Sequence, residues 1–142
     1  MKARQIVIDT NVFISALRSQ LGASYKLLMM LGSRKFEMNV SVSLAMEYEA
    51  VLKRVLSETK LSKNDAEEIL NYVFSVANRR KVYYLWRPFL PDAKDDMVLE
   101  LAVSADCKII VTFNKKDFRG AEKFGIRIMT PREFLRQIGE IK

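Results

Sequence analysis

The stretch Gln5-Ile6-Val7-Ile8-Asp9-Thr10-Asn11 decides the fold of this chain. Its three consecutive branched apolar residues predict a short strand buried on both faces, which is typical of the centre of a parallel sheet. Val12–Leu17 then resumes an apolar pattern that suits a helix. Asp9 therefore follows the carboxyl end of a strand, where open α/β sheets bind ligands. A helix N-cap is the alternative role, because Asp, Thr and Asn all supply one.

The length of 142 residues predicts a single domain, residues 1–142, with a full hydrophobic core. No apolar run reaches the length that spans a membrane. The N-terminal residues lead directly into the first strand without a signal-peptide pattern, so we expect a cytoplasmic protein. The single cysteine, Cys107, excludes an internal disulfide.

The absence of histidine limits the chemistry that this chain can perform. It excludes Ser-His-Asp and Cys-His catalysis, and with one cysteine it also excludes zinc sites built from imidazole or thiolates. A bound metal must be held by oxygen ligands, which favours Mg²⁺ or Mn²⁺. The net charge of +7 suits a polyanionic partner such as RNA or DNA without identifying one.

Strand and helix patterns alternate along the rest of the chain, which predicts a three-layer α/β/α sandwich around a mainly parallel sheet. Strands are expected at 36–40, 82–85, 108–112 and 126–129, with a loop at 86–91. Helices are expected at 23–31, from Ser41 or Ser43 to about 56, and from a capping box at Ser62 to about 78. Two further helices are expected after Asp92 and after the capping box Thr130-Pro131-Arg132-Glu133.

Two groups of carboxylates stand out on these helices. Glu47 lies beside the apolar stripe of its helix, whereas Glu49 points to the opposite, solvated face. Asp95 shares one helical face with three apolar residues, so its spacing aims it at the same interior: Val98, Leu99 and Ala102. Its neighbour Asp96 repels it, and a nearby cation would relieve that cost. Capping, dipole interaction and a satisfied structural carboxylate remain the alternatives.

Together these motifs resemble the PIN domain family, and within it the VapC-like toxin ribonuclease branch. The matching segments follow the family's order over nearly the whole chain: 7–12, 47–48, 91–102, 110–112, 114–118 and 125–135. The resemblance implies a PIN-like fold and a hydrolase that cuts single-stranded RNA with Mg²⁺ or Mn²⁺. It also implies a homodimer and, for a toxin, a small antitoxin protein that covers the site.

Carried over by motif, the resemblance assigns roles to particular residues. The implied catalytic residues are Asp9, Glu47, Asp95, Asp96 and Asp117, and the implied metal ligands are Asp9, Glu47, Asp95 and Asp117. Helical phase favours Asp95 over Asp96, whereas the choice between Asn114 and Asp117 stays open. Thr10, Asn11, Thr112 and Asn114 are expected to orient the ligands. Lys115, Lys116 and Arg119 are expected to hold the substrate backbone.

The proposed chemistry agrees with the residue inventory, because carboxylate-held metal ions activate water and neutralise charge without histidine. Three alternatives are weaker. A response-regulator receiver domain requires an acidic pair by the first strand, and a haloacid-dehalogenase-type phosphatase requires a second Asp where Asn11 stands. A catalytically degenerate PIN module that binds RNA or protein is the third, and the retained carboxylates argue against it.

Overall fold

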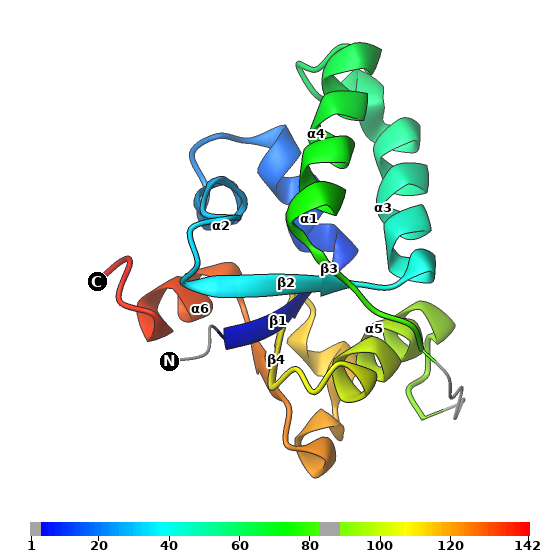
Figure 1. Ribbon diagram of the computed structural model, residues 1–142, viewed down its shortest axis with the longest axis vertical. Helices are drawn as coiled ribbons and strands as arrows, with labels where there is room; N and C mark the ends of the chain where they lie inside the picture. Colours follow the sequence, from blue (N-terminus) through cyan, green and yellow to red (C-terminus); the bar gives the residue numbers. More distant parts are fainter. Residues whose placement is uncertain (1–3, 83–88) are drawn as a thin grey trace.

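The computed structural model describes residues 4–82 and 89–142, and Figure 1 shows its arrangement. Within these residues five parallel strands form one sheet in the order β3-β2-β1-β4-β5. The strands are β1 (Arg4–Ile8), β2 (Phe36–Val40), β3 (Asn78–Arg79), β4 (Ile109–Val111) and β5 (Arg127–Met129). The α-helices are α1 (Thr10–Arg18), α2 (Ala23–Met29), α3 (Val42–Val55), α4 (Lys63–Val76), α5 (Ala93–Ser104) and α6 (Pro131–Gln137). Short 3₁₀ helices lie at η1 (Leu56–Glu58), η2 (Lys115–Phe118) and η3 (Ala121–Phe124).

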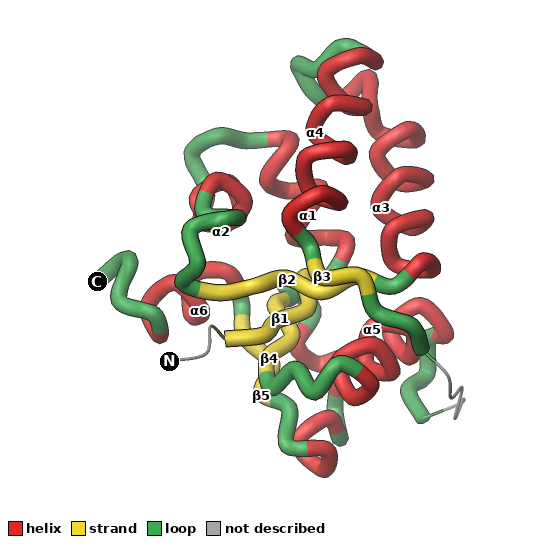
Figure 2. The backbone as a smooth tube through the Cα atoms, in the orientation of Figure 1, coloured by secondary structure: helices red, strands yellow, loops and turns green. Residues whose placement is uncertain are grey.

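The first strand is central, as its apolar sequence predicts. Ile6 pairs with Met38 of β2 on one side and with Ile109 of β4 on the other, and it is fully buried. Helices α1, α3 and α4 stand on one face of the sheet and α5 lies on the other (Figures 1 and 2). The predicted α/β/α sandwich with a parallel sheet is therefore confirmed.

Local hydrogen bonds fix where the helices begin. The Ser41 hydroxyl accepts the Leu44 N–H at 3.1 Å and starts α3 directly after β2. Both predicted capping boxes form, between Ser62 and Asp65 and between Thr130 and Glu133. These caps set the direction in which each helix leaves the sheet.

The structure adds an edge strand that the sequence did not predict. Helix α4 ends at Val76, and β3 follows at Asn78–Arg79. The Asn78 amide donates to the Gln5 side chain, and the Arg80 N–H donates to the Val40 carbonyl at 2.8 Å. Because polar hydrogen bonds position this strand, its sequence contains no apolar pattern that would predict it. Val82 lies outside any strand, and residues 83–85 and the predicted loop at 86–88 lie outside the described residues.

Helix α4 also differs from its expected packing face. Helical spacing in the sequence places Ile69, Tyr72, Val73 and Val76 on one apolar face, but Tyr72 is half-exposed and donates its hydroxyl to the Leu31 carbonyl. Leu70 is buried with Ala66 and Val73 instead. Among the described residues, no helix is both long and apolar enough to cross a membrane.

Candidate functional site

Asp9 stands at the junction of β1 and α1. Its backbone N–H donates to the Val111 carbonyl at 2.9 Å, which keeps it in register with β4. Its Oδ1 accepts the Thr10 N–H at 2.9 Å, and its Oδ2 accepts the Thr112 hydroxyl at 2.7 Å. Asp9 therefore caps α1, and it is also tied to the end of β4. Each carboxylate oxygen retains capacity for a further ligand, so the cap does not exclude a binding role.

Tyr48 connects this junction to helix α3. It is fully buried, its hydroxyl donates to the Ile8 carbonyl, and its ring stacks on Phe13 with centroids 4.6 Å apart. Glu47 precedes Tyr48 on the same helix. Tyr48 thereby anchors α3 to the end of β1, and the charge of Glu47 acts on Asp9.

The adjacent carboxylates of α5 have opposite environments. Asp96 is 1% exposed, and it accepts the Leu90 N–H at 2.8 Å and the Phe89 N–H at 3.3 Å. Asp95 is only partly buried. The expectation that Asp95 points into the interior is therefore wrong, because Asp96 is the buried member of the pair. The segment before α5 folds back over the helix start and supplies the N–H donors that make burial of Asp96 favourable.

Four carboxylates act on one another electrostatically at the carboxyl edge of the sheet. Burial raises the pKa of Asp9, and the charges of Asp117 and Glu47 raise it further, although two hydrogen bonds oppose this. Burial, followed by the charges of Asp9, Asp92 and Asp117, raises the pKa of Asp95 to about 7. We name Asp9, Glu47, Asp95 and Asp117 the acidic cluster. Its members come from four elements: the β1–α1 junction, α3, α5 and η2.

Little positive charge balances the acidic cluster. Within residues 4–82 and 89–142, the cation found in ion-pair range of it is Lys94, whose Nζ lies 3.6 Å from Glu47 Oε1. This pairing has no sequence signal, since the partners are 47 positions apart on different helices. As the side chains stand, the described residues include no group of three carboxylates close enough to hold a metal ion. The donors are nevertheless all oxygens that repel one another, which is the chemistry that suits Mg²⁺ or Mn²⁺.

Thr112 is the centre of the hydrogen bonds around Asp9. Besides donating to Asp9, its buried hydroxyl accepts the Asn114 N–H at 3.0 Å and faces the Asn11 amide at 3.4 Å. The Asn11 carbonyl oxygen in turn accepts the Phe113 N–H at 3.4 Å. Asn11 and Asn114 thus contact the carboxylate through Thr112, whereas Thr10 contacts it through its main chain.

The predicted substrate-binding residues lie beside the acidic cluster on the surface. Lys115, Lys116 and Arg119 are all exposed, and the Lys115 ammonium pairs with Glu133 at 2.9 Å. Sequence reasoning missed Phe113, a 48% exposed aromatic side chain directly after buried Thr112. A bulky aromatic residue at the exit of a buried strand is the signal that could have identified it.

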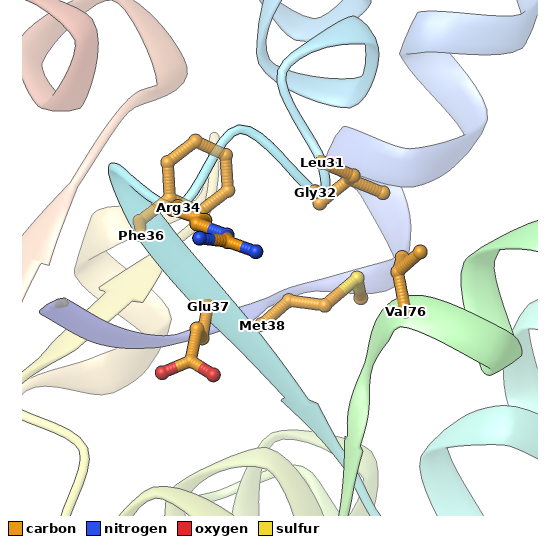
Figure 3. Close-up of a pocket in the computed structure, with 7 residues that line it drawn as sticks. All are labelled: Leu31, Gly32, Arg34, Phe36, Glu37, Met38 and Val76. Carbon is orange, nitrogen blue, oxygen red and sulfur yellow. The ribbon is translucent and has the colours of Figure 1, made fainter.

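A cleft of about 340 Å³ beside β2 is separate from this site (Figure 3). It is lined by the 31–34 turn, the first residues of β2 and Val76. Its one carboxylate, Glu37, accepts the Gln5 amide at 2.6 Å. The cleft therefore lies at the amino half of the sheet and shares no residue with the acidic cluster.

Comparison with known proteins identifies the family. The model of the PIN domain matches residues 5–116, which is most of the chain. The chain therefore belongs to the PIN domain family, whose members are generally nucleases, and the predicted family is confirmed. None of the curated proteins compared with the chain matches it.

The fold is also similar to that of a solved structure, VapBC2 from Rickettsia felis bound to a DNA fragment from their promoter. The TM-score is 0.57 at 15% sequence identity, and the match covers 89% of this chain and 98% of that one. At this identity the likeness describes the fold.

Proposed function

We propose that the chain is an endoribonuclease that hydrolyses single-stranded RNA with Mg²⁺ or Mn²⁺, and that it is the toxin of a toxin–antitoxin pair. The acidic cluster carries this proposal, because four carboxylates from separate elements gather around little positive charge. Strongly perturbed carboxylates at the carboxyl edge of a parallel sheet are typical of functional sites. The nuclease chemistry of the PIN domain family supports the same conclusion.

In this proposal the acidic cluster holds the ion, with Asn114 as a further oxygen donor. The bound ion supplies an activated water and neutralises charge on the phosphate. Thr112 and the Thr10 N–H orient Asp9. Asp96 holds the start of α5 in place, which leaves the Asp95 carboxylate on the cluster side. Lys94 pairs with Glu47 at 3.6 Å and would have to release it for Glu47 to serve as a ligand.

Exposed side chains around the acidic cluster suit a single-stranded substrate. Phe113 offers a ring on which an unpaired base can stack, and Lys116 and Arg119 are exposed cations for its phosphates. Val42 and Met46, one turn apart on α3, are exposed apolar residues on the helix that carries Glu47. These exposed apolar residues support a protein partner that contacts α3, which could be an antitoxin or a second copy of the chain.

Metal-dependent cleavage tests the proposal. Purified protein is mixed with labelled single-stranded RNA in Mg²⁺, in Mn²⁺ and in excess EDTA, beside an Asp9→Asn protein purified in parallel. We expect cleavage with either ion, none in EDTA, recovery when the ion is restored, and none by the variant. Equal cleavage by the variant, or undiminished cleavage in EDTA, would contradict the assignment.

The same experiment distinguishes the proposed enzyme from the alternative, a catalytically degenerate PIN module. It is favoured by the spacing of the carboxylates, no three of which lie within metal-holding distance among the described residues. That module predicts RNA binding without cleavage in any ion. The proposed enzyme predicts instead that added Mg²⁺ or Mn²⁺ raises the melting temperature of the wild type and not of Asp9→Asn, because ligands that bind the native state stabilise it.

A further inference from the structure

A basic cleft of about 720 Å³ lies at the amino edge of the sheet, opposite the acidic cluster. Four cationic side chains line it: Arg4 of β1, Arg80 after β3, Lys108 before β4 and Arg127 of β5. Its two acids are already engaged. Glu37 accepts the Gln5 amide at 2.6 Å, and Asp106 pairs with Lys108 at 2.9 Å.

A second cleft of about 470 Å³ runs along the outer side of β5. Arg127 and Gln137 line both clefts, so the two clefts are neighbours. The second cleft adds Arg136 of α6 and Lys115 of η2. Lys115 and Asp117 both belong to η2, so the second cleft borders the element that carries this member of the acidic cluster.

We name these six cations the basic path: Lys115, Arg136, Arg127, Lys108, Arg4 and Arg80. Two of them are paired with acids, Lys115 with Glu133 and Lys108 with Asp106. Among the described residues, no ion pair or side-chain hydrogen bond involves the exposed guanidinium groups of Arg4 and Arg127. Such groups bind phosphate oxygens in bidentate geometry. Within residues 4–82 and 89–142, β5 is the last strand of the sheet, and no further strand pairs with its outer side.

We propose that the basic path binds the phosphate backbone of the RNA beyond the point of cleavage, so that the substrate spans two edges of the sheet. The inference rests on the proposed RNA substrate. Charge favours this occupant, because repeated phosphates match a line of six cations of which local acids pair with only Lys115 and Lys108. A path along β5 is about 10 Å long, since parallel strands rise about 3.3 Å per residue. Only an oligonucleotide that extends past the acidic cluster reaches Arg127 and Arg4.

The test measures RNA binding by fluorescence anisotropy in EDTA, so that cleavage plays no part. Two lengths are compared, about 4 and about 16 nucleotides, the range that single-stranded binding sites cover. The variant is Arg4→Gln combined with Arg127→Gln. The matched control removes the same charge at the α4 end of the molecule, with Lys60→Gln and Lys63→Gln, both at exposed residues.

We expect the Arg variant to bind the long RNA at least fivefold more weakly and the short RNA within twofold of wild type. Loss of two phosphate contacts should also reduce the salt slope for the long RNA by about 1.4. The Lys control should change neither length by more than twofold. Equal loss at both lengths, equal loss in the control, or no RNA binding by the wild type overturns the proposal.

An acidic partner protein is the other occupant that such a path could have. If polyglutamate binding depends on Arg4 and Arg127 while long-RNA binding does not, the RNA proposal is wrong. Failure of the nuclease assignment is distinguishable, because a wild type that cleaves nothing can still show the length dependence. Conversely, if the protein cleaves RNA but the variant shows no length-dependent loss of binding, the nuclease assignment stands and the basic-path proposal is wrong.

Discussion

The two edges of the sheet treat their carboxylates in opposite ways. At the amino edge, Glu37 and Asp106 each have a partner, at 2.6 Å and 2.9 Å. At the carboxyl edge, the described residues provide the acidic cluster with one lysine at 3.6 Å, and the pKa values of Asp9 and Asp95 are raised. Glu37 and Asp106 are paired although they are exposed, whereas Asp9 is buried, where a charge without a neutralising partner is costly. The acidic cluster therefore persists although burial and repulsion between its carboxylates are unfavourable, which is a common property of functional sites.

An Asp→Asn substitution at each edge should give the largest difference between the two edges. Asp9→Asn keeps the size and capping ability of the side chain but removes its charge. We expect RNA cleavage to fall by more than about a hundredfold, beyond the usual loss from an outer-shell group. Asp106→Asn at the amino edge should leave cleavage of an RNA too short to reach the basic path within twofold. Cleavage rates on labelled RNA, with melting curves to verify folding, measure both, and an active Asp9→Asn protein ends the nuclease assignment.

Thr112→Val should sharpen the comparison by removing only the hydroxyl that holds Asp9. The buried shape is kept, while Asp9 Oδ2 loses its 2.7 Å hydrogen bond. We expect metal affinity and cleavage to fall by roughly tenfold, the lower end of outer-shell effects. Titration of Mn²⁺ by calorimetry gives the affinity directly. An unchanged affinity would mean that Thr112 supports the fold and not the ligand.

Asp95 and Asp96 are adjacent on α5 but differ in the same way: Asp96 accepts main-chain hydrogen bonds, whereas Asp95 faces other carboxylates. Asp96→Asn weakens the bonds to the Phe89 and Leu90 N–H groups, so it should lower the free energy of unfolding by about 1–3 kcal/mol. Asp95→Asn, without metal, should be neutral or stabilising. Urea denaturation of both variants at pH 7.5 in EDTA measures these changes. The reverse order would mean that Asp95 holds the start of α5.

The smallest expected effect is the pH dependence that Asp95 adds to stability. Its folded pKa of about 7 lies above the ordinary value of 3.8, so the native state binds more protons between these values. Stability therefore falls as pH rises from about 4 to 7, and Asp95→Asn removes this fall. The difference between variant and wild type should grow across that window to on the order of 1 kcal/mol, since water screens a partly exposed group. Denaturation without metal at pH 4, 5.5 and 7.5 tests it, and a pH-independent difference contradicts it.

Much of the fold could be predicted because its signals are local. Buried central strands leave uninterrupted apolar runs, as in β1, and Ser62 and Thr130 mark helix starts through bonds to residues three positions away. The edge strand at Asn78–Arg79 could not be predicted. Its position depends on bonds to Gln5 and Val40, which are distant in sequence.

The elements that carry the candidate residues could be predicted, but the environments of these residues could not. Strand ends and helix phase pointed to Asp9, Glu47, Asp95 and Asp117, whose membership of one site stays a prediction, and the charges of Asp117 and Glu47 act on Asp9. Helix phase could not predict that Asp96 is the buried carboxylate, because its donors come from the segment before the helix. Nor could it predict the Lys94–Glu47 pair, which exists only after α3 and α5 are packed around the sheet. The metal-binding roles themselves remain predictions.

The sheet order also sets when the site is completed during synthesis. Asp9 leaves the ribosome early, yet its partner Thr112 follows 103 residues later and Asp117 later still. Domains generally fold as units during translation, and pairing of β1 with β4 must close that whole span of chain. A nascent chain that stops before Thr112 therefore carries β1 without its central neighbour and Asp9 without its hydroxyl. If this protein cuts RNA, it stays inactive toward the messenger that encodes it until the chain has emerged past Asp117.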